Sequence, residues 1–387
     1  MKHPLAGRGV LALGSSLTLL GTIRVLAAAG ADIVVPLDAD SFVRRSRVFR
    51  SKGTRTADCA EPGFGDRLSA LPDGTVLIPC SDAWARTLGA LAPEARARYP
   101  VSVAPLETLN TLINKGRLSA VLDRLGLPHP ETHPLSSKDD LDRFTEEQIR
   151  TSFIKPTESQ QFFARFAVKA FHIAGRDDGV RRLRECLDAG LDVVLQEYIP
   201  GPPTEHYFLD GFVDRTGVVR ARFARQRLRM SPADFGNSSA MVSVPLAVVA
   251  DAVRSLDTLL EKVGYRGIFS AEFKRDPRDG RFKLLEINAR AWWYIEFAAR
   301  CGVDVGTLAV LDALDQPVPD ITSYQAGRRC VYPSYDYEVI RAERAAGRMT
   351  LVDWAVSWIG AMQPVFRWTD PWPAWGAMLA HLRRRLF

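Results

Sequence analysis

Cysteine is scarce in this sequence. The five cysteines among 387 residues are scattered along the chain, and none belongs to a CxxC pair. A disulfide framework and a structural zinc site are therefore not expected, and the pattern fits a reducing, cytoplasmic compartment. The cysteines are Cys59, Cys80, Cys186, Cys301 and Cys330.

Long apolar runs are also missing. None approaches the roughly 20 residues that a membrane-spanning helix needs. The first residues, with Lys2 and Arg8 before an apolar stretch, superficially resemble a secretory signal. The uncharged stretch ends at Arg24 and contains Gly14 and Gly21, a pattern that fits a buried strand, a turn and a helix better.

Neither sign of charge dominates the chain. The 51 Lys and Arg residues against 45 Asp and Glu give a net charge of +6 that is spread along the sequence, so we expect no nucleic-acid partner. Hydrophobic residues make up 47% of the chain, which is enough for a sizeable core and excludes global disorder. The length predicts two or three structural units in one globular body.

The N-terminal region has the pattern of a βαβ unit. Residues 9–13 form an apolar run, Gly14 begins a turn, and apolar residues at helical spacing follow over 17–27. A second strand is predicted over 32–35. Because the fingerprint GxGxxG is absent, we expect a Rossmann-like topology without NAD binding. This α/β unit is expected to end near residue 105.

The middle of the chain mixes strands and helices. Helices are predicted over 106–125, 138–148, 179–189 and 247–263, and strands over 153–156, 166–171, 193–199, 205–212, 218–227 and 240–244. A hairpin follows, with strands over 267–274 and 281–288 joined by a loop rich in turn-forming residues.

The hairpin carries the most informative residues. If its turn centres near Asp279, Glu272 and Glu286 lie opposite each other, and Asn288 shares their face because side chains alternate along a strand. Two carboxylates and an amide oxygen are ligands for a hard divalent cation, and Mg²⁺ held partly through phosphates fits best. Arg290 would add positive charge beside the metal. The alternative is an exposed acidic hairpin without a ligand.

Two further groups of residues suit a nucleotide. Lys155 and Lys169 each end or interrupt an apolar strand, where they would bind phosphate oxygens or be ordinary strand-end lysines. The strand over 193–199 precedes a Pro/Gly break, so its end offers backbone groups to an adenine edge, and Glu205 could take ribose hydroxyls. The alternative is a buried strand that meets a hinge.

Taken in order, these segments resemble the ATP-grasp superfamily over roughly residues 8–310. The matching segments are Asn114-Lys115, Phe153-Ile154-Lys155-Pro156, Val168-Lys169-Ala170, Gln196 to Gly201, Glu272-Phe273-Lys274 and Leu285 to Arg290. The resemblance implies an α/β ATP-grasp fold over 106–315, preceded by a Rossmann-like preATP-grasp domain over 1–105. A Trp-rich extension with a basic end would occupy 316–387.

The resemblance also implies residue roles, with ATP and Mg²⁺ or Mn²⁺ as cofactors. The expected ATP-binding residues are Lys115, Lys155, Lys169, Gln196, Glu197, Tyr198, Ile199 and Glu205. The expected metal ligands are Glu272, Glu286 and Asn288, and Arg290 and Lys169 are the expected catalytic residues. Many relatives have a glycine-rich loop between the two lysines. Here the corresponding residues 157–165 lack glycine, so the resemblance does not extend to a glycine-rich, phosphate-binding lid.

Within the superfamily, residues 227–239 are similar to carboxylate–amine ligases of the D-aspartate ligase type. Arg225, Arg227 and Arg229 alternate, so they would line one strand face and hold an anionic substrate, or else form a solvated basic edge strand. The resemblance implies a ligase that joins a small carboxylate and an amine through an acyl phosphate and releases ADP and phosphate. The alternatives are a biotin carboxylase-like or carbamoyl-phosphate synthase-like enzyme that uses bicarbonate, and a catalytically silent ATP-binding module.

The C-terminal segment concentrates tryptophan and positive charge. Five of the eight tryptophans lie there, namely Trp354, Trp358, Trp368, Trp372 and Trp375, and the chain ends with arginine at 383–385. Such a segment either packs its rings on the ligase body or contacts a membrane surface. We expect packing.

Overall fold

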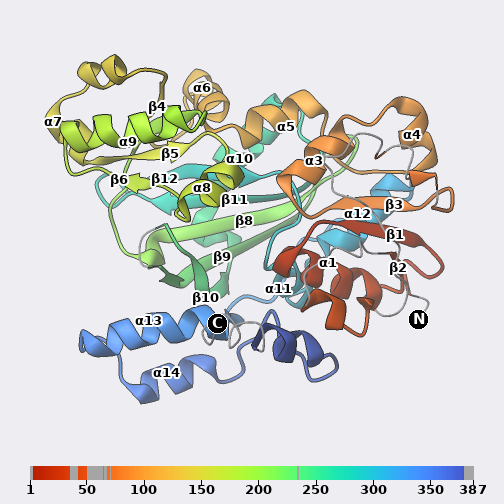
Figure 1. The fold of residues 1–387 in the computed structure, drawn as a ribbon. Coiled ribbons are helices and arrows are strands. Elements are labelled where there is room, and N and C mark those ends of the chain that lie inside the picture. Colours follow the sequence, from red (N-terminus) through yellow and green to blue (C-terminus); the bar gives the residue numbers. More distant parts are fainter. Residues whose placement is uncertain are drawn as a thin grey trace.

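The computed structural model describes residues 3–34, 42–49, 64, 68–69, 71–232 and 235–378, and the side chains of 159 and 160 are not described. It contains three β-sheets that lie in separate layers with helices between and around them (Figure 1). The expected mixed α/β class is confirmed. No helix among the described residues is long and apolar enough to cross a bilayer.

The N-terminal sheet is a parallel three-stranded layer in the order β2-β1-β3. Its strands are β1 (Gly9–Leu13), β2 (Asp32–Val34) and β3 (Val76–Pro79), and its helices are α1 (Ser16–Ala28), η1 (Val43–Arg45), α3 (Asp82–Gly89) and α4 (Pro93–Arg98). Gly14 makes the turn into α1 at φ +145°, and a Cβ there would lie 2.8 Å from the Cβ of Cys80. Glycine is therefore required for the expected strand–turn–helix.

The small antiparallel sheet has the order β4-β7-β5-β6. Its strands are β4 (Thr132–Leu135), β5 (Ser152–Pro156), β6 (Phe171–His172) and β7 (Val193–Glu197). The helices of this region are η3 (Lys138–Arg143), α7 (Glu146–Arg150), α8 (Ser159–Phe166) and α9 (Arg176–Asp188). A separate apolar cluster that includes Leu141, Ile154 and Leu183 joins the sheet to these helices.

Three expectations in this part of the chain are wrong. The helix expected over 138–148 is two elements, η3 and α7, because Phe144 is extended and Thr145 is the N-cap of α7. The helix expected over 106–125 is two helices, α5 (Leu106–Ile113) and α6 (Lys115–Leu125), because Asn114 is extended and its side chain accepts a hydrogen bond from the Arg117 amide as the N-cap of α6. The strand expected over 166–171 is mostly absent. Helix α8 runs to Phe166, and only Phe171–His172 pair as β6.

The large sheet has six antiparallel strands in the order β12-β11-β8-β9-β10-β13. They are β8 (His206–Val213), β9 (Val219–Ser231), β10 (Asn237–Val244), β11 (Gly267–Arg275), β12 (Phe282–Asn288) and β13 (Arg329–Val331), with η4 (Pro203–Glu205) before β8. Helices α5, α6, η5 (Leu246–Val249) and α10 (Ala250–Lys262) share one apolar cluster with this sheet. Strand β9 is internal, so the alternative of a basic edge strand is wrong.

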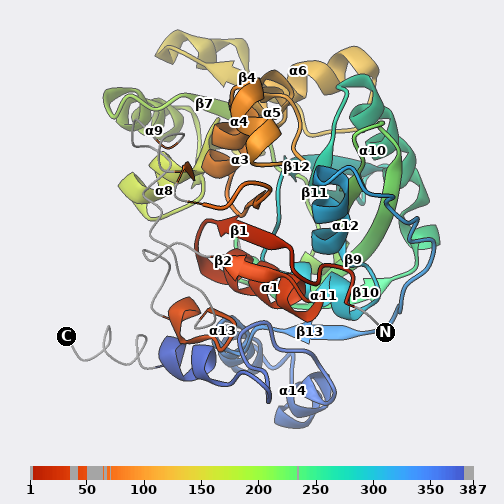
Figure 2. The same cartoon turned by 90° about the vertical axis from the view of Figure 1, so that its right-hand side faces the viewer.

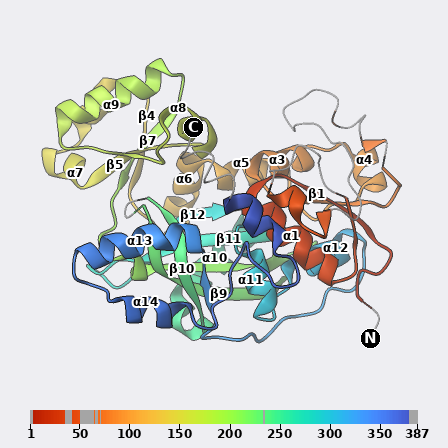
Figure 3. The same cartoon turned by 60° about the horizontal axis from the view of Figure 1, so that its bottom comes forward.

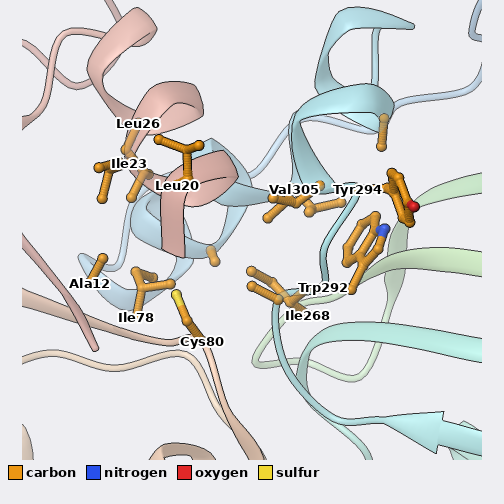
Figure 4. Packing of buried hydrophobic residues seen from close by; sticks show 14 of the residues in the cluster. Ala12, Leu20, Ile23, Leu26, Ile78, Cys80, Ile268, Trp292, Tyr294 and Val305 are labelled. Atoms are coloured by element: carbon orange, nitrogen blue, oxygen red, sulfur yellow. The ribbon is translucent and has the colours of Figure 1, made fainter. Parts of the chain in front are cut away.

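One hydrophobic core joins the N-terminal sheet to the far side of the large sheet. Helices α11 (Ile295–Arg300) and α12 (Val305–Ala313) pack against α1, and apolar side chains from all three meet there, including Leu20, Ile23 and Val305 (Figure 4). The expected domain boundaries near 105 and 315 remain predictions.

The C-terminal segment lies along the lower side of the molecule, where its first helix packs against β9 and β10 (Figure 2). It contains α13 (Pro333–Ala345), α14 (Leu351–Trp358) and a last described helix over 372–378. Asp370 accepts hydrogen bonds from the fully buried Arg24 of α1 and from Ser46. The expected packing therefore holds for the path of the chain. Of the rings, Trp354 and Trp358 are partly buried as expected, whereas Trp368 is 90% exposed and Trp372 and Trp375 are about half exposed, so packing does not hold for these three.

Candidate active site

A cleft of about 250 Å³ lies between the small sheet and the large sheet. Figure 3 shows the small sheet with α7 and α9 on one side and the large sheet on the other. The polar residues that line the cleft are Lys155, Lys169, Gln196, Glu197, Tyr198, His206, Arg227, Glu272, Lys274 and Glu286. Eight of the residues predicted from the sequence as ATP or metal contacts thus line this cleft, and the other three, Lys115, Glu205 and Asn288, are absent from its described lining. The eight are Lys155, Lys169, Gln196, Glu197, Tyr198, Ile199, Glu272 and Glu286.

The acidic pair of the hairpin lies as the turn register predicts. Glu272 of β11 is paired directly with Glu286 of β12, and a register shift follows between Glu272 and Phe273. Glu286 is 37% exposed, and its carboxylate lies 3.9 Å from the Lys155 ammonium. This carboxylate is therefore available on the floor of the cleft.

Glu272 is held much more firmly. Its Oε1 atom lies 3.0 Å from a guanidinium nitrogen of Arg227 and 2.8 Å from Nδ1 of His206. Burial opposes ionisation of this carboxyl, but Arg227 and His206 outweigh it and hold the pKa of Glu272 well below its usual range. Sequence reasoning missed His206, which is recognisable only when β8 is placed beside β11.

The three lysines predicted to contact ATP are not equivalent. Lys169 lies in the loop before β6 and donates a 2.6 Å hydrogen bond to Oδ1 of Asn237. Lys115 begins α6 and is buried, and it is absent from the described cleft lining. Burial, together with the charge of Lys155, lowers the pKa of Lys115 to about 8.

The hinge strand β7 ends at the opposite side of the cleft. The carboxylate of Glu197 is engaged by Arg278 and lies 3.3 Å from Lys283. The Ile199 carbonyl accepts a 2.7 Å hydrogen bond from Lys274. Glu205 is paired with Arg275 at 2.7 Å and is absent from the described cleft lining, so the structure does not bring the predicted ribose ligand into the cleft.

An aromatic group flanks the hinge and was not identified from the sequence. The ring centroids of Phe153 and Phe235 are 4.6 Å apart, and those of Tyr198 and Phe235 are 6.4 Å apart. Phe235 comes from the β9–β10 connection, so a loop of the large sheet touches the small sheet across the cleft. All three rings line the cleft and offer apolar surface to a planar base.

The arginine stripe of β9 is not one binding surface. Arg225 is buried with Asp210, at 2.7 Å, and Arg229 makes two 2.7 Å contacts with Asp336 of α13. Of the three predicted substrate residues, Arg227 alone is part of the described cleft lining. Alternation along the strand was predicted correctly, but buried carboxylates on neighbouring elements take up the other two charges.

Arg290 and Asn288 lie at the end of β12, beside the N-terminal layer. Arg290 donates to both carboxylate oxygens of Asp82, at 2.9 and 3.2 Å, and to Oδ1 of Asn288, at 2.9 Å. Asp82 is the first residue of α3. The predicted catalytic arginine is therefore oriented by a carboxylate of the preceding layer, a contact that sequence reasoning did not identify.

The donor set of the hairpin fits a hard cation. Two carboxylates lie opposite each other, and the amide of Asn288 follows on the same strand. Within the described ranges, no cluster of three or more His, Cys, Asp and Glu side chains is placed to hold a metal. An ion at the hairpin would thus need phosphate oxygens to complete its coordination, which is typical of Mg²⁺.

Comparison with known proteins supports this interpretation of the fold. No family model matches the sequence. A D-aspartate ligase from Enterococcus faecium (strain Aus0004) is 26% identical over 223 residues, which are 56% of this chain and 53% of that protein. The chain thus spans about half the length of this curated relative.

Solved structures extend the similarity to most of the chain. The N5-carboxyaminoimidazole synthetase of Staphylococcus aureus, complexed with ADP, has a TM-score of 0.63, 13% identity and coverage of 85% of this chain and 82% of that one. This is the ATP-grasp fold. The resemblances to ATP-grasp proteins and to the D-aspartate ligase type, both noted from the sequence, are confirmed by these similarities in fold and in sequence.

Two further ATP-grasp structures are similarly close. The L-amino acid ligase of Bacillus licheniformis has a TM-score of 0.62 at 14% identity and covers 84% of this chain and 79% of its own. The biotin carboxylase domain of Hydrogenobacter thermophilus 2-oxoglutarate carboxylase, in complex with MgADP, ADP and bicarbonate, has a TM-score of 0.62 at 14% identity, with coverage of 83% and 72%.

Proposed function

We propose that this protein is an ATP- and Mg²⁺-dependent carboxylate–amine ligase that forms an amide through an acyl phosphate and releases ADP and phosphate. The observation that supports it best is the facing of Lys155 and Lys169 with the paired Glu272 and Glu286 in one cleft. Cationic groups and an anionic metal-binding pair at the same place match the needs of phosphoryl transfer.

The residues divide the work between the two ends of the cleft. The aromatic rings and the end of β7 would hold the base, while Lys155, Lys169 and the buried Lys115 would bind phosphate oxygens as point charges. Glu272, Glu286 and Asn288 would hold Mg²⁺, which when bound neutralises charge on the outer phosphates. Arg290, oriented by Asp82, would stabilise the transferring phosphoryl group.

The proposed substrates are a small carboxylic acid and an amine. The name of the Enterococcus faecium relative makes D-aspartate the first acid to test. Arg227 is the member of the arginine stripe that remains a candidate for contact with the acid, since it lines the cleft. Its guanidinium also holds Glu272, so it would couple the acid to the metal site.

Bicarbonate is the second candidate acid, because one solved structure with this fold contains bicarbonate. In that case ATP consumption would depend on bicarbonate and not on an added carboxylate. A silent ATP-binding module would release no ADP with either. The β11–β12 hairpin carries all three oxygen donors, Glu272, Glu286 and Asn288, and these favour an active enzyme.

The test is an ADP-release screen with Mg²⁺, candidate acids and hydroxylamine as a general nucleophile. We expect ADP release that requires Mg²⁺ and one carboxylic acid, with the matching hydroxamate as product. ADP release that follows bicarbonate alone would favour the carboxylase alternative. No acid-dependent or bicarbonate-dependent ADP release, with ATP binding intact, would contradict an enzymatic function.

A further inference from the structure

Helix α14 is apolar on two sides. Its inner side faces the body, where Trp358 donates a 2.7 Å hydrogen bond to the buried Asp336, and Ser357 accepts one from Arg229. The Trp354 and Trp358 rings contact each other at 5.0 Å. These contacts fix the orientation of the helix on the body.

The outer side of the same helix is also apolar. Leu351, Val352 and Val356 lie within one face at 100° per residue, and Ile359 continues this face just after the helix. Their side chains are 51–75% exposed. Asp353 interrupts the apolar surface of the helix, but the outer residues together form an exposed apolar patch of the kind that marks an interaction site.

Exposed aromatic rings extend this apolar surface. Trp368, Trp372, Trp375 and Met378 are between 46% and 90% exposed. Figures 1 and 2 both place α13, α14 and the last described helix along the same lower side of the molecule, and Figure 3 turns that side towards the viewer. We call the exposed residues of this side the tail surface. They are Leu351, Val352, Val356, Ile359, Trp368, Trp372, Trp375 and Met378.

The described residues around the tail surface carry a small excess of positive charge, which the sequence beyond them increases. Of the five acidic residues over 329–378, Asp336 and Asp370 are buried and paired with Arg229 and Arg24. Four exposed arginines, Arg329, Arg341, Arg344 and Arg348, stand against the three remaining carboxylates. Three more arginines at 383–385 follow in the sequence beyond the described residues. Positive charge beside exposed tryptophan and aliphatic side chains complements an anionic lipid surface.

We propose that the tail surface binds peripherally to an anionic membrane, with the rings and aliphatic side chains of the tail in the interface and the arginines over lipid head groups. The described lining of the nucleotide cleft contains no residue of the tail surface. Binding would therefore place the enzyme at a membrane without covering the cleft.

The test is co-sedimentation of the full chain with vesicles of phosphatidylcholine alone and with about 30% phosphatidylglycerol. We expect binding to the anionic vesicles that weakens as salt rises from about 0.05 to about 0.5 M. The double variant Val352→Asp/Val356→Asp should lower the vesicle affinity by at least about tenfold, because it places charge in the interface.

A matched control uses two exposed valines elsewhere. Val218 and Val248 are each 46% exposed and lie outside the tail, so Val218→Asp/Val248→Asp adds the same charge. We expect this control to bind vesicles within about twofold of the parent, and both double variants to keep the parent's melting temperature.

Three results would overturn the proposal. One is the absence of binding to anionic vesicles. A second is equal loss of binding in both double variants, which would indicate a general charge effect. A third is a concentration-dependent dimer that Val352→Asp/Val356→Asp dissociates, since a second copy of the chain would then cover the tail surface.

Discussion

The two carboxylates of the acidic hairpin share a register but not an environment. Glu272 is 14% exposed and bound by Arg227 and His206, whereas Glu286 is 37% exposed with Lys155 at 3.9 Å. We call a charge deep where a buried partner within the protein holds it, as for Glu272 and for the Arg225–Asp210 pair outside the cleft lining, and shallow where it is more exposed, as for Glu286. A deep charge is fixed in place before a ligand binds, so Glu272 would be a pre-oriented metal ligand and Glu286 an adaptable one.

The largest expected effect comes from the shallow carboxylate. Glu286→Gln removes a charged ligand of the proposed metal. It breaks no close buried ion pair, because the Lys155 ammonium is 3.9 Å away. Turnover should fall by at least about 100-fold while the melting temperature stays unchanged. Steady-state rates at saturating Mg²⁺ and a melting curve test this prediction. A rate within about threefold of the parent would remove Glu286 from the metal site.

The buried Arg225–Asp210 pair should show the opposite behaviour, with a large loss of stability on substitution. Arg225→Ala leaves the buried Asp210 carboxylate without its partner and should lower the free energy of unfolding by about 3–5 kcal/mol. Denaturant unfolding measures this loss. If Arg225 instead held the substrate, the KM for the acid would rise with little change in stability, and the distinction between deep and shallow charges would fail.

These differences were partly readable from the sequence. The turn residues over 276–280 predict the hairpin, and the register then places Glu272 opposite Glu286. The pairing of Arg227 with Glu272 and of Arg225 with Asp210 was not predictable, because it depends on the order of β8, β9 and β11 in the sheet. Strand order arises from long-range packing, which local patterns do not encode.

Local errors had local causes. Asn114 is a good N-cap residue, and that signal could have divided the helix expected over 106–125. The largely apolar run over 166–171 resembles a strand, but the preceding sequence forms an amphipathic helix that ends at Phe166 and buries Phe162. The contact between Phe235 and Phe153 could not be predicted from the sequence, because the two residues belong to different sheets and lie far apart in the chain.

A smaller effect is expected at the contact that crosses the cleft. Asn237→Ala removes the acceptor of Lys169, so the lysine should be less well placed for phosphate. We expect the KM for ATP to rise by about three- to tenfold, in line with the loss of one hydrogen bond to a charged group. Lys169→Met should exceed this effect, and a larger effect of Asn237→Ala would contradict the assigned order.

The smallest expected effect is a pH dependence of stability from Lys115. Its pKa is about 8 in the folded protein and near its usual value when unfolded, so the unfolded chain binds more protons between these values. Stability should therefore rise with pH from about 8 to about 10. Unfolding at several pH values tests this, and Lys115→Met should reduce the rise. If the unfolding free energy of the variant rose with pH as steeply as that of the parent, the pKa of Lys115 would not be lowered in the folded protein.

The nucleotide product tests the central proposal most directly. If Lys155, Lys169 and the acidic hairpin act on the outer phosphates, each amide or hydroxamate formed should be accompanied by one ADP and one phosphate. Chromatography of the nucleotides after a few turnovers measures this ratio. The account predicts stoichiometric ADP and no AMP, and stoichiometric AMP with pyrophosphate would contradict it.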